Sequence, residues 1–417
     1  MPTLSSSNRT QVAYKLEGTY PTNFGVPQAG NGVLINFTGE SLGFDVKNEM
    51  SKAIRSDRQV ADLIQVSGSP SGGLNFELNF KDVDPWVLGA VQNDWTYQGT
   101  LGDSSAATGT LTFTSTTITN SVAPTANDAY TTLTKGQWFT LAPPASATQA
   151  VKDWFNTHPL RVSSTTSPTT TVITLDAATP IATAIVTTTM AVGSVLTSAR
   201  AANGTVMKSY TLEVGHLDIG NVFRQYTGMV PSKLDLTVSS GAIVTGAVEF
   251  MGKSLNLLAT TSMGTPTAAQ AFTPANATRG VWDVLENGTT ISATTYVKSA
   301  SITLDNSLRA QDAVGVFGNA GVGVGTFKVT GKMQVYLADS VIYAKVLSGA
   351  ASSFSLPIVD IDGNGYVFQF GRIKYTSAKV NAGGQDQDNM LDVEFQAVID
   401  NVAASPTFGS TVVVYRI

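Results

Sequence analysis

The feature that most constrains this chain is the alternation of apolar and polar residues with a period of two. In residues 74–80, Leu and Phe alternate with Asn and Glu, and the same period recurs in residues 234–238, 327–335 and 391–397. A period of two is typical of β-strands that pack one face on a core and turn the other toward water or a partner. We therefore expect a mainly β protein.

The order of the expected elements occurs twice along the chain. The first set starts near residue 33 with a strand, a long loop over 45–73, a second strand and a short helix near 84–92, and further strands follow within 205–257. The second set starts at residue 296 and repeats that order. Internal repeats determine the whole architecture of a chain. The pattern predicts two tandem β units, each with one short helix packed on a sheet.

The remaining segments differ in composition from these two units. Residues 100–204 are rich in Thr and Ser and poor in charge, but scattered aromatic and β-branched residues indicate a small folded insertion. We therefore divide the chain into an N-terminal arm (1–32), a discontinuous first unit (33–99 and 205–257), an inserted small all-β domain (100–204), a linker (258–295) and a second unit (296–417).

The charge content limits what the surface can do. Charged residues make up 13% of the 417 residues, against about 25% in typical soluble domains. So few charges leave few solvated faces, and the exposed edges of the sheets are expected to meet partners. The formal net charge is −5. This acidic balance argues against a protein that grips nucleic acid, because such proteins need a basic surface.

The chain is also poor in residues that carry chemistry. It has no cysteine and only two histidines, His158 and His216, so we expect no disulfide framework, no thiolate metal site and no hydrolytic triad. Residues 360–365 imitate the start of a calcium loop, but the twelfth position is Gly371 where a Glu is needed, so a turn is predicted. No stretch approaches the roughly 18 apolar residues of a membrane span. We expect a soluble protein without catalysis, cofactor or membrane insertion.

Several strand and turn signatures carry a family resemblance. They are residues 37–42 (Phe-Thr-Gly-Glu-Ser-Leu), 54–62, 73–78, 223–229, 241–246 and 250–254 in the first unit, and residues 304–306 and 329–331 in the second. Together they resemble the major tail tube protein of long, non-contractile-tailed (siphovirus-like) bacteriophages. The resemblance covers nearly the whole chain outside the insertion.

The resemblance implies a fold and a set of partners. The fold would be a tandem duplicated tail-tube β-sandwich or barrel whose subunits close into stacked rings around a lumen for the viral DNA, with the insertion on the outside. Two units per chain favour a ring of three chains with pseudo-sixfold symmetry, and six chains are the alternative. The implied partners are the chain itself, a tape measure protein, a tail terminator and distal tail proteins. The implied location is the virion tail, after assembly in the host cytoplasm.

Carboxylates on the polar faces of the expected strands are the candidates for the lumen. Asp392 and Glu394 are two residues apart, so their side chains leave the same face of one strand. Glu77 and Glu249 occupy the polar positions of two other strands. An acidic lumen would repel the DNA backbone. The competing interpretation of each carboxylate is an ordinary solvated strand face.

The loop over residues 45–73 is the most charged part of the chain. Its functional interpretation is a splayed hairpin that grips the neighbouring subunit and the next ring through ion pairs, and its competing interpretation is a solvated surface loop. The candidate residues for the contacts between subunits and between rings are Lys47, Glu49, Lys52, Arg55, Asp57, Arg58 and Asp62.

Two alternatives remain open from the sequence. Another phage shell component, such as a capsid decoration protein, would share the β-rich, low-charge composition. A carbohydrate-binding or adhesin module is the other, and it would need an exposed aromatic platform. The only candidates for that platform are Trp138, Trp154 and Phe155 in the insertion, which we expect to lie in its core.

Overall fold

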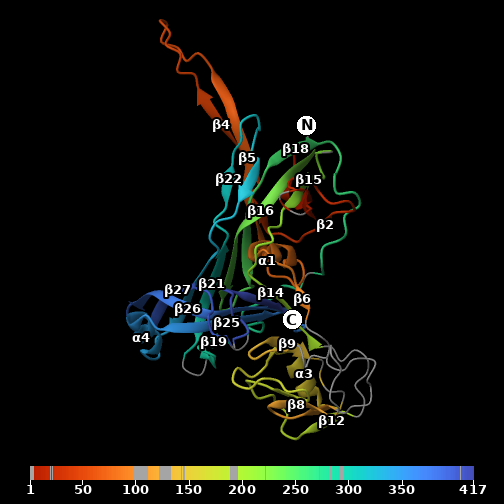
Figure 1. Ribbon diagram of the computed structural model, residues 1–417, viewed down its shortest axis with the longest axis vertical. Coiled ribbons are helices and arrows are strands. Elements are labelled where there is room, and N and C mark those ends of the chain that lie inside the picture. The colour runs from red at the N-terminus through yellow and green to blue at the C-terminus, as the bar shows by residue number, and fades with distance from the viewer. Residues whose placement is uncertain are drawn as a thin grey trace.

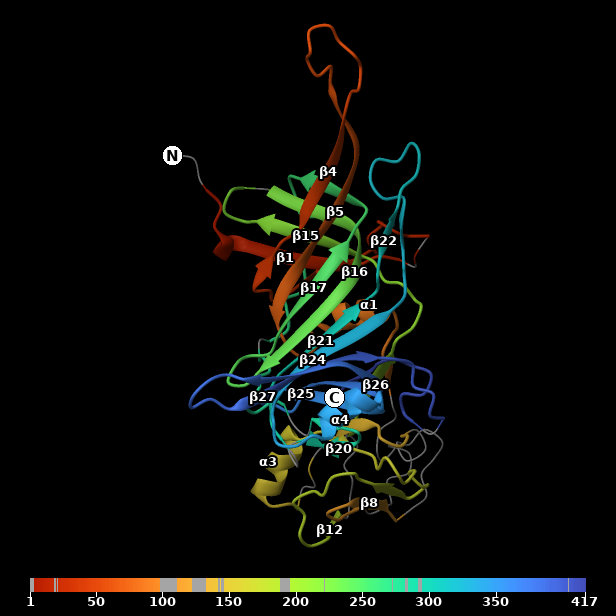
Figure 2. The same ribbon diagram turned by 90° about the vertical axis from the view of Figure 1, so that its left-hand side faces the viewer.

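The alternating segments form neighbouring strands of one sheet in the computed structural model (Figures 1 and 2). The structure describes residues 4–417 except 19, 21, 98–110, 122–132, 142, 144–145, 188–195, 221, 272, 282–283, 292–294 and 404. We call the following run of antiparallel neighbours the central sheet: β5 (Leu63–Glu77), β17 (Thr245–Met251), β16 (Val222–Ser239), β21 (Val297–Asp305), β24 (Lys328–Tyr336), β27 (Asn389–Ala397) and β26 (Gly365–Ala382).

The two faces of the central sheet differ as the period of two predicts. On one face Leu74, Val248, Leu234 and Leu304 lie opposite one another on successive strands, and all four are buried in the main core. The residues between them point to the other face, which is polar. Because the strand period is two, this assignment of faces follows from the sequence alone.

The strand pairing of the first half of the chain recurs in the second half. The order β5–β17–β16–β15 (Tyr210–His216) is matched by β24–β27–β26–β25 (Ala351–Val359). Each half also has a short helix, α1 (Asp84–Val91) and α4 (Val341–Ser348). Pairing between β16 and β21 joins the two halves into one sheet, and one core holds residues of both.

Helix α1 is held by packing and by its first turn. Trp86 and Val87 are buried, and Pro85 lies in the first turn, where a missing N–H costs nothing. The residue at the cap position is Val83, which makes no side-chain bond there, and Asp82 precedes it. The Asp82 carboxylate instead accepts hydrogen bonds from the backbone N–H and the side-chain amide of Asn36.

An extended arm is predicted over residues 1–32, but part of this segment is packed. After the short 3₁₀ helix η1 (Ser7–Arg9), β1 (Thr10–Leu16) pairs along its whole length with β15 and also contacts β2 (Val33–Leu34). Val12 is fully buried in the main core. A single strand is stabilised by its pairing with a strand that is distant in the sequence, and the local amino-acid composition does not predict that pairing.

The passage over residues 258–295, predicted as a linker, also packs on the two halves. It follows β18 (Ser254–Leu258) and contains β19 (Leu285–Glu286) and β20 (Thr289–Thr290). β19 pairs with β25, and Met263 is fully buried.

The insertion forms a separate end of the molecule, opposite the long hairpin of β4 (Gly43–Met50) and β5 (Figure 1). Its own core includes Phe113, Phe139 and Val162. Its elements are β7 (Leu111–Phe113), β8 (Thr117–Asn120), β11 (Val172–Thr174) and β12 (Ile185–Thr187) in one sheet, β9 (Trp138–Leu141), β10 (Leu160–Arg161) and β13 (Leu196–Thr197) in another, and α3 (Gln149–Thr157). The chain returns through β14 (Ala199–Ala202), which pairs with β6 (Thr96–Tyr97) and β28 (Val413–Arg416).

Candidate assembly interfaces

The polar face of the central sheet brings together all four carboxylates that the sequence nominates. One row of directly opposed residues runs from Glu77 through Thr245, Thr237 and Ser301 to Lys332 and then Glu394. On the same face, Asp392 lies in the next row on one side, and Glu249 lies two rows away on the other. The side chain of Glu249 is exposed, and those of the other three are half-buried.

Other charged residues share this face, and Lys328 and Lys332 are recognisable from the period of two in residues 327–335. Asp235 and Asp305 add two carboxylates, and the lysines of the face are Lys233, Lys328, Lys332, Lys374 and Lys379. Asp235 was recognisable, because it lies between Leu234 and Leu236 in an alternating stretch. Six carboxylates against five lysines leave the face close to neutral.

Most of these lysines lie beside a carboxylate. Lys332 contacts Glu394 at 2.7 Å, and Lys233 contacts Asp235 at 2.7 Å. The hydrogen bond from Lys332 lowers the pKa of Glu394, and the bond to Asp235 raises the pKa of Lys233. Lys328 lies directly opposite Asp305 on the neighbouring strand. The cations of this face are thus largely neutralised by neighbours.

The segment over residues 45–73 is a long β-hairpin, as its functional interpretation expects, and not the irregular loop of the predicted element order. β4 pairs with β5 from Gly43–Ser71 to Met50–Leu63. Residues 66–73 are Gly- and Ser-rich and read as a loop, but the cross-strand bonds to β4 supply the order that their side chains do not. Figure 1 shows this hairpin projecting beyond the rest of the molecule; we call residues 45–66 the arm.

The arm is exposed in the single chain. It has no buried residue, and apolar side chains such as Ile54 and Leu63 lie in the open. Two-stranded hairpins are marginally stable on their own. An arm that exposes both backbone and apolar surface is therefore built to contact something else.

The structure places all seven predicted arm residues on this hairpin. Lys47 and Glu49 lie on β4, and the other five lie in the tip that follows it. Arg55 and Asp57 pair with each other at 2.5 Å, and this bond lowers the pKa of Asp57. Arg58 adopts a left-handed backbone with φ 57°, which turns the tip.

The second half has a shorter hairpin, β22 (Arg309–Gln311) and β23 (Gly321–Gly323), at the equivalent place in the chain. The base of this hairpin packs on its own chain, whereas residues 309–317 are exposed. The ring of Phe317 lies 6.3 Å from that of Phe44 at the base of the arm, and Asn319 donates a hydrogen bond of 2.7 Å to the carbonyl of Gly252.

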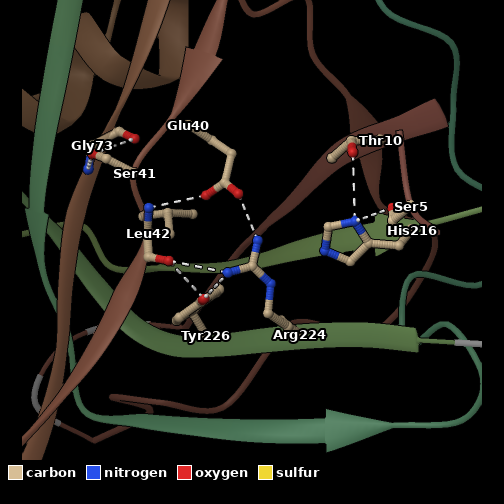
Figure 3. A network of polar contacts seen from close by, with 9 residues as sticks. All are labelled: Ser5, Thr10, Glu40, Ser41, Leu42, Gly73, His216, Arg224 and Tyr226. Atoms are coloured by element: carbon tan, nitrogen blue, oxygen red, sulfur yellow. Dashed lines mark hydrogen bonds and ion pairs between the residues drawn. The ribbon is translucent and has the colours of Figure 1, made fainter. Parts of the chain in front are cut away.

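A polar network holds the chain just before the arm (Figure 3). Glu40 on β3 (Gly39–Glu40) accepts a bond of 2.5 Å from Arg224. Its other carboxylate oxygen accepts from the N–H of Leu42 at 3.0 Å. The carbonyl of Leu42 in turn accepts bonds from Arg224 (3.2 Å) and from the hydroxyl of Tyr226 (2.9 Å). Burial raises the pKa of Tyr226, so that hydroxyl remains protonated and donating.

The remaining chemical candidates have structural roles. His216 ends β15 and lies within hydrogen-bond distance of the hydroxyls of Ser5 and Thr10 (Figure 3). Asp360 accepts bonds from backbone N–H groups of the turn between β25 and β26, as the turn prediction requires. Within the described residues, no group of three or more His, Asp or Glu could hold a metal ion.

The three aromatic residues nominated for a sugar-binding platform do not form an exposed one. Trp138 and Phe155 are buried, as expected, and Trp154 is partly buried and packs against the core of the insertion. In the described part of the chain, no helix is long and apolar enough to cross a membrane.

The fold and these surfaces define a structural β protein. A family model described as phage tail tube protein matches residues 7–397, nearly the whole chain. The chain therefore belongs to the phage tail tube protein family, which is a structural family and not a family of enzymes. A search of curated protein sequences finds no significant match.

Proposed function

We propose that this chain is the major tail tube subunit of a phage with a long, non-contractile tail. Copies of the chain join into rings, and the rings stack into a tube through which the DNA leaves the virion. The family match over residues 7–397 is the observation that carries this proposal. Family membership implies self-assembly into a tube and a place in the virion tail.

The polar face of the central sheet is the proposed wall of the lumen. Each unpaired cation that meets a phosphate adds affinity for DNA through counterion release. On this face Lys332 and Lys233 have carboxylate partners, and Lys328 lies directly opposite Asp305. Such a wall would attract DNA weakly, which suits a conduit. Glu77, Glu249, Asp392 and Glu394 are the proposed acidic positions of the wall.

The arm is the proposed contact to the neighbouring subunit and to the next ring. Its exposed apolar residues are unfavourable in water and can be covered by another copy. Its charges of both signs can form ion pairs with that copy. The insertion lies at the end of the molecule opposite the arm, and we assign it to the outside of the tube.

The repeated strand order supports a ring of three chains with pseudo-sixfold symmetry, and six chains are the alternative. The proposed partners beyond further copies are a tape measure protein in the lumen, a tail terminator at one end and distal tail proteins at the other. Assembly would take place in the host cytoplasm.

Negative-stain electron microscopy of concentrated purified protein tests this function. We expect hollow filaments with a regular axial repeat, and class averages viewed down the axis give the number of chains per ring. Discrete particles at every concentration and salt condition would overturn the proposal. They would favour a capsid decoration protein or an adhesin module instead.

A further inference from the structure

The junction between the two halves of the chain shows how one unit pairs with the next. The distal part of β16 pairs with β21 over seven residues, from Lys233–Asp305 to Ser239–Ser299. Its apolar residues Leu234 and Leu236 are thereby buried. Among the described strands of the central sheet, this junction is where the first half passes to the second.

β26 is the counterpart of β16 in the second half. Both strands have 18 residues, and both have a register shift in the middle, between Pro231 and Lys233 in β16 and between Tyr375 and Ser377 in β26. With the shifts aligned, Leu236 corresponds to Val380. Val380 pairs with Leu391 of β27, just as Leu236 pairs with Gly246 of β17.

The distal part of β26 lacks the neighbour that β16 has. In the described chain, residues 377–382 pair with β27 on one edge and with no strand on the other. The consequence is visible in burial: Val380 is 43% exposed, whereas its counterpart Leu236 is 3% exposed. The apolar side chain at this position is therefore buried in the first half and exposed in the second half.

The matching open edge lies in the first half. β21 pairs with β24 on one edge and with β16 on the other. Its counterpart is the segment 40–45, formed by the end of β3 and the start of β4, and this segment pairs with β5 alone among the described strands. Glu40 lies opposite Leu74 as Ala300 lies opposite Met333.

We propose that residues 377–382 of β26 pair antiparallel with residues 40–45 of a second copy of this chain, so that the junction within the chain is repeated between chains. Transfer of the internal register places Ala382 opposite Glu40, Val380 opposite Leu42 and Ala378 opposite Phe44 of the next copy. This inference rests on the proposed tube and names the edges that close its rings.

The network around Glu40 has a role in this pairing. The N–H of Ser41 bonds to Gly73 of β5, so the N–H and C=O of Leu42 point to the open edge. In the single chain Glu40, Arg224 and Tyr226 occupy those two groups. Side chains that satisfy an exposed strand edge guard it against wrong partners. When the next copy pairs with this edge, the N–H of Leu42 exchanges its hydrogen bond to Glu40 for one to the carbonyl of Val380.

The chain has no cysteine, so one introduced pair can report the register. The register places Ser377 opposite Asp45 of the next copy in a pair without backbone hydrogen bonds. Such pairs have Cα atoms about 4.5 Å apart, within the range of a disulfide, about 4.4–6.8 Å. The test variant is Ser377→Cys with Asp45→Cys, and both side chains are exposed in the single chain. The matched control is Ser377→Cys with Lys47→Cys, which shifts the pair by two residues along the strand.

Filaments of each variant are formed in reductant, oxidised, and analysed on a non-reducing denaturing gel. We expect the Ser377–Asp45 variant to give covalent multimers up to the ring size, with at least ten times the cross-linked yield of the control. Filaments that cross-link equally in both variants, better in the control, or in neither overturn the register while leaving the tube intact. A failure of wild-type protein to form filaments overturns the proposed function itself.

Discussion

The two halves of the chain have the same strand order but differ in how their edges are satisfied. In the first half, β16 has neighbours along both edges of its distal part, and its apolar residues are buried. In the second half, the equivalent part of β26 has one neighbour, and Val380 remains exposed. The hairpins differ in the opposite sense: the base of the second one packs on its own chain, whereas the first projects beyond the rest of the molecule. Each half thus has one element completed inside the chain and one left open, which makes assembly a continuation of folding.

The same substitution at equivalent positions should separate folding from assembly. Leu236→Asp buries a charge in the main core, and we expect the free energy of unfolding to fall by about 4 kcal/mol or more. Val380→Asp leaves the single chain folded, because that side chain is half exposed, but it blocks the proposed junction. Urea unfolding and electron microscopy measure the two effects.

Val186→Asp is the control, since Val186 is an exposed valine of the insertion. It should leave both stability and filaments unchanged. Normal filaments from Val380→Asp would break the comparison between β16 and β26.

Removal of most of the arm tests the open hairpin of the first half. Deletion of residues 47–63 removes no buried residue, so we expect a folded monomer with an unchanged circular dichroism spectrum. Because the deleted segment carries the proposed contacts to other copies, sedimentation should show no polymer at any concentration.

The packed hairpin supplies the contrast. Phe317→Ala removes a ring that contacts the chain's own Phe44. We expect a loss of about 1 kcal/mol in stability with filaments retained. A polymer of normal length from the arm deletion would contradict the assignment of the arm.

The polar network around Glu40 should contribute more to the free energy of unfolding than an ion pair on the polar face does. Arg224→Met leaves the half-buried carboxylate of Glu40 without its cation, and we expect the free energy of unfolding to fall by about 1–3 kcal/mol. Lys332→Met removes an ion pair between exposed side chains and should leave stability unchanged within error. Equal losses of stability for Arg224→Met and Lys332→Met in urea unfolding would contradict this difference.

The smallest expected effect is a shift in titration. The hydrogen bond from Lys332 holds the pKa of Glu394 below its ordinary value of 4.5. Since the folded pKa is depressed, the associated stability is present above the ordinary value and is lost as the pH falls through the folded pKa. Carboxyl NMR titration should show this low pKa in the Val380→Asp monomer and a return toward 4.5 when Lys332→Met is added. An unchanged pKa would contradict the pairing.

The sequence predicted local features well and distant partners poorly. The face shared by Asp392 and Glu394 follows from a period of two, which is a property of neighbouring residues. The extension of β5 over residues 63–73 was missed, because this Gly- and Ser-rich half of the strand takes its order from β4. β1 was missed for the same reason, since its stability comes from β15, about 200 residues away.

The amino-acid sequence by itself determined that the chain is mainly β, that its elements occur twice, and that its strands have one polar face. These properties reside in the spacing of side chains along a pleated backbone. Only the tertiary structure decided which strand lies beside which, and therefore which edges of β16 are closed and which edge of β26 is open. Backbone N–H groups are chemically alike in every strand, so they do not specify which strand will pair with them. The pairing is determined by the packing of side chains across the whole sheet.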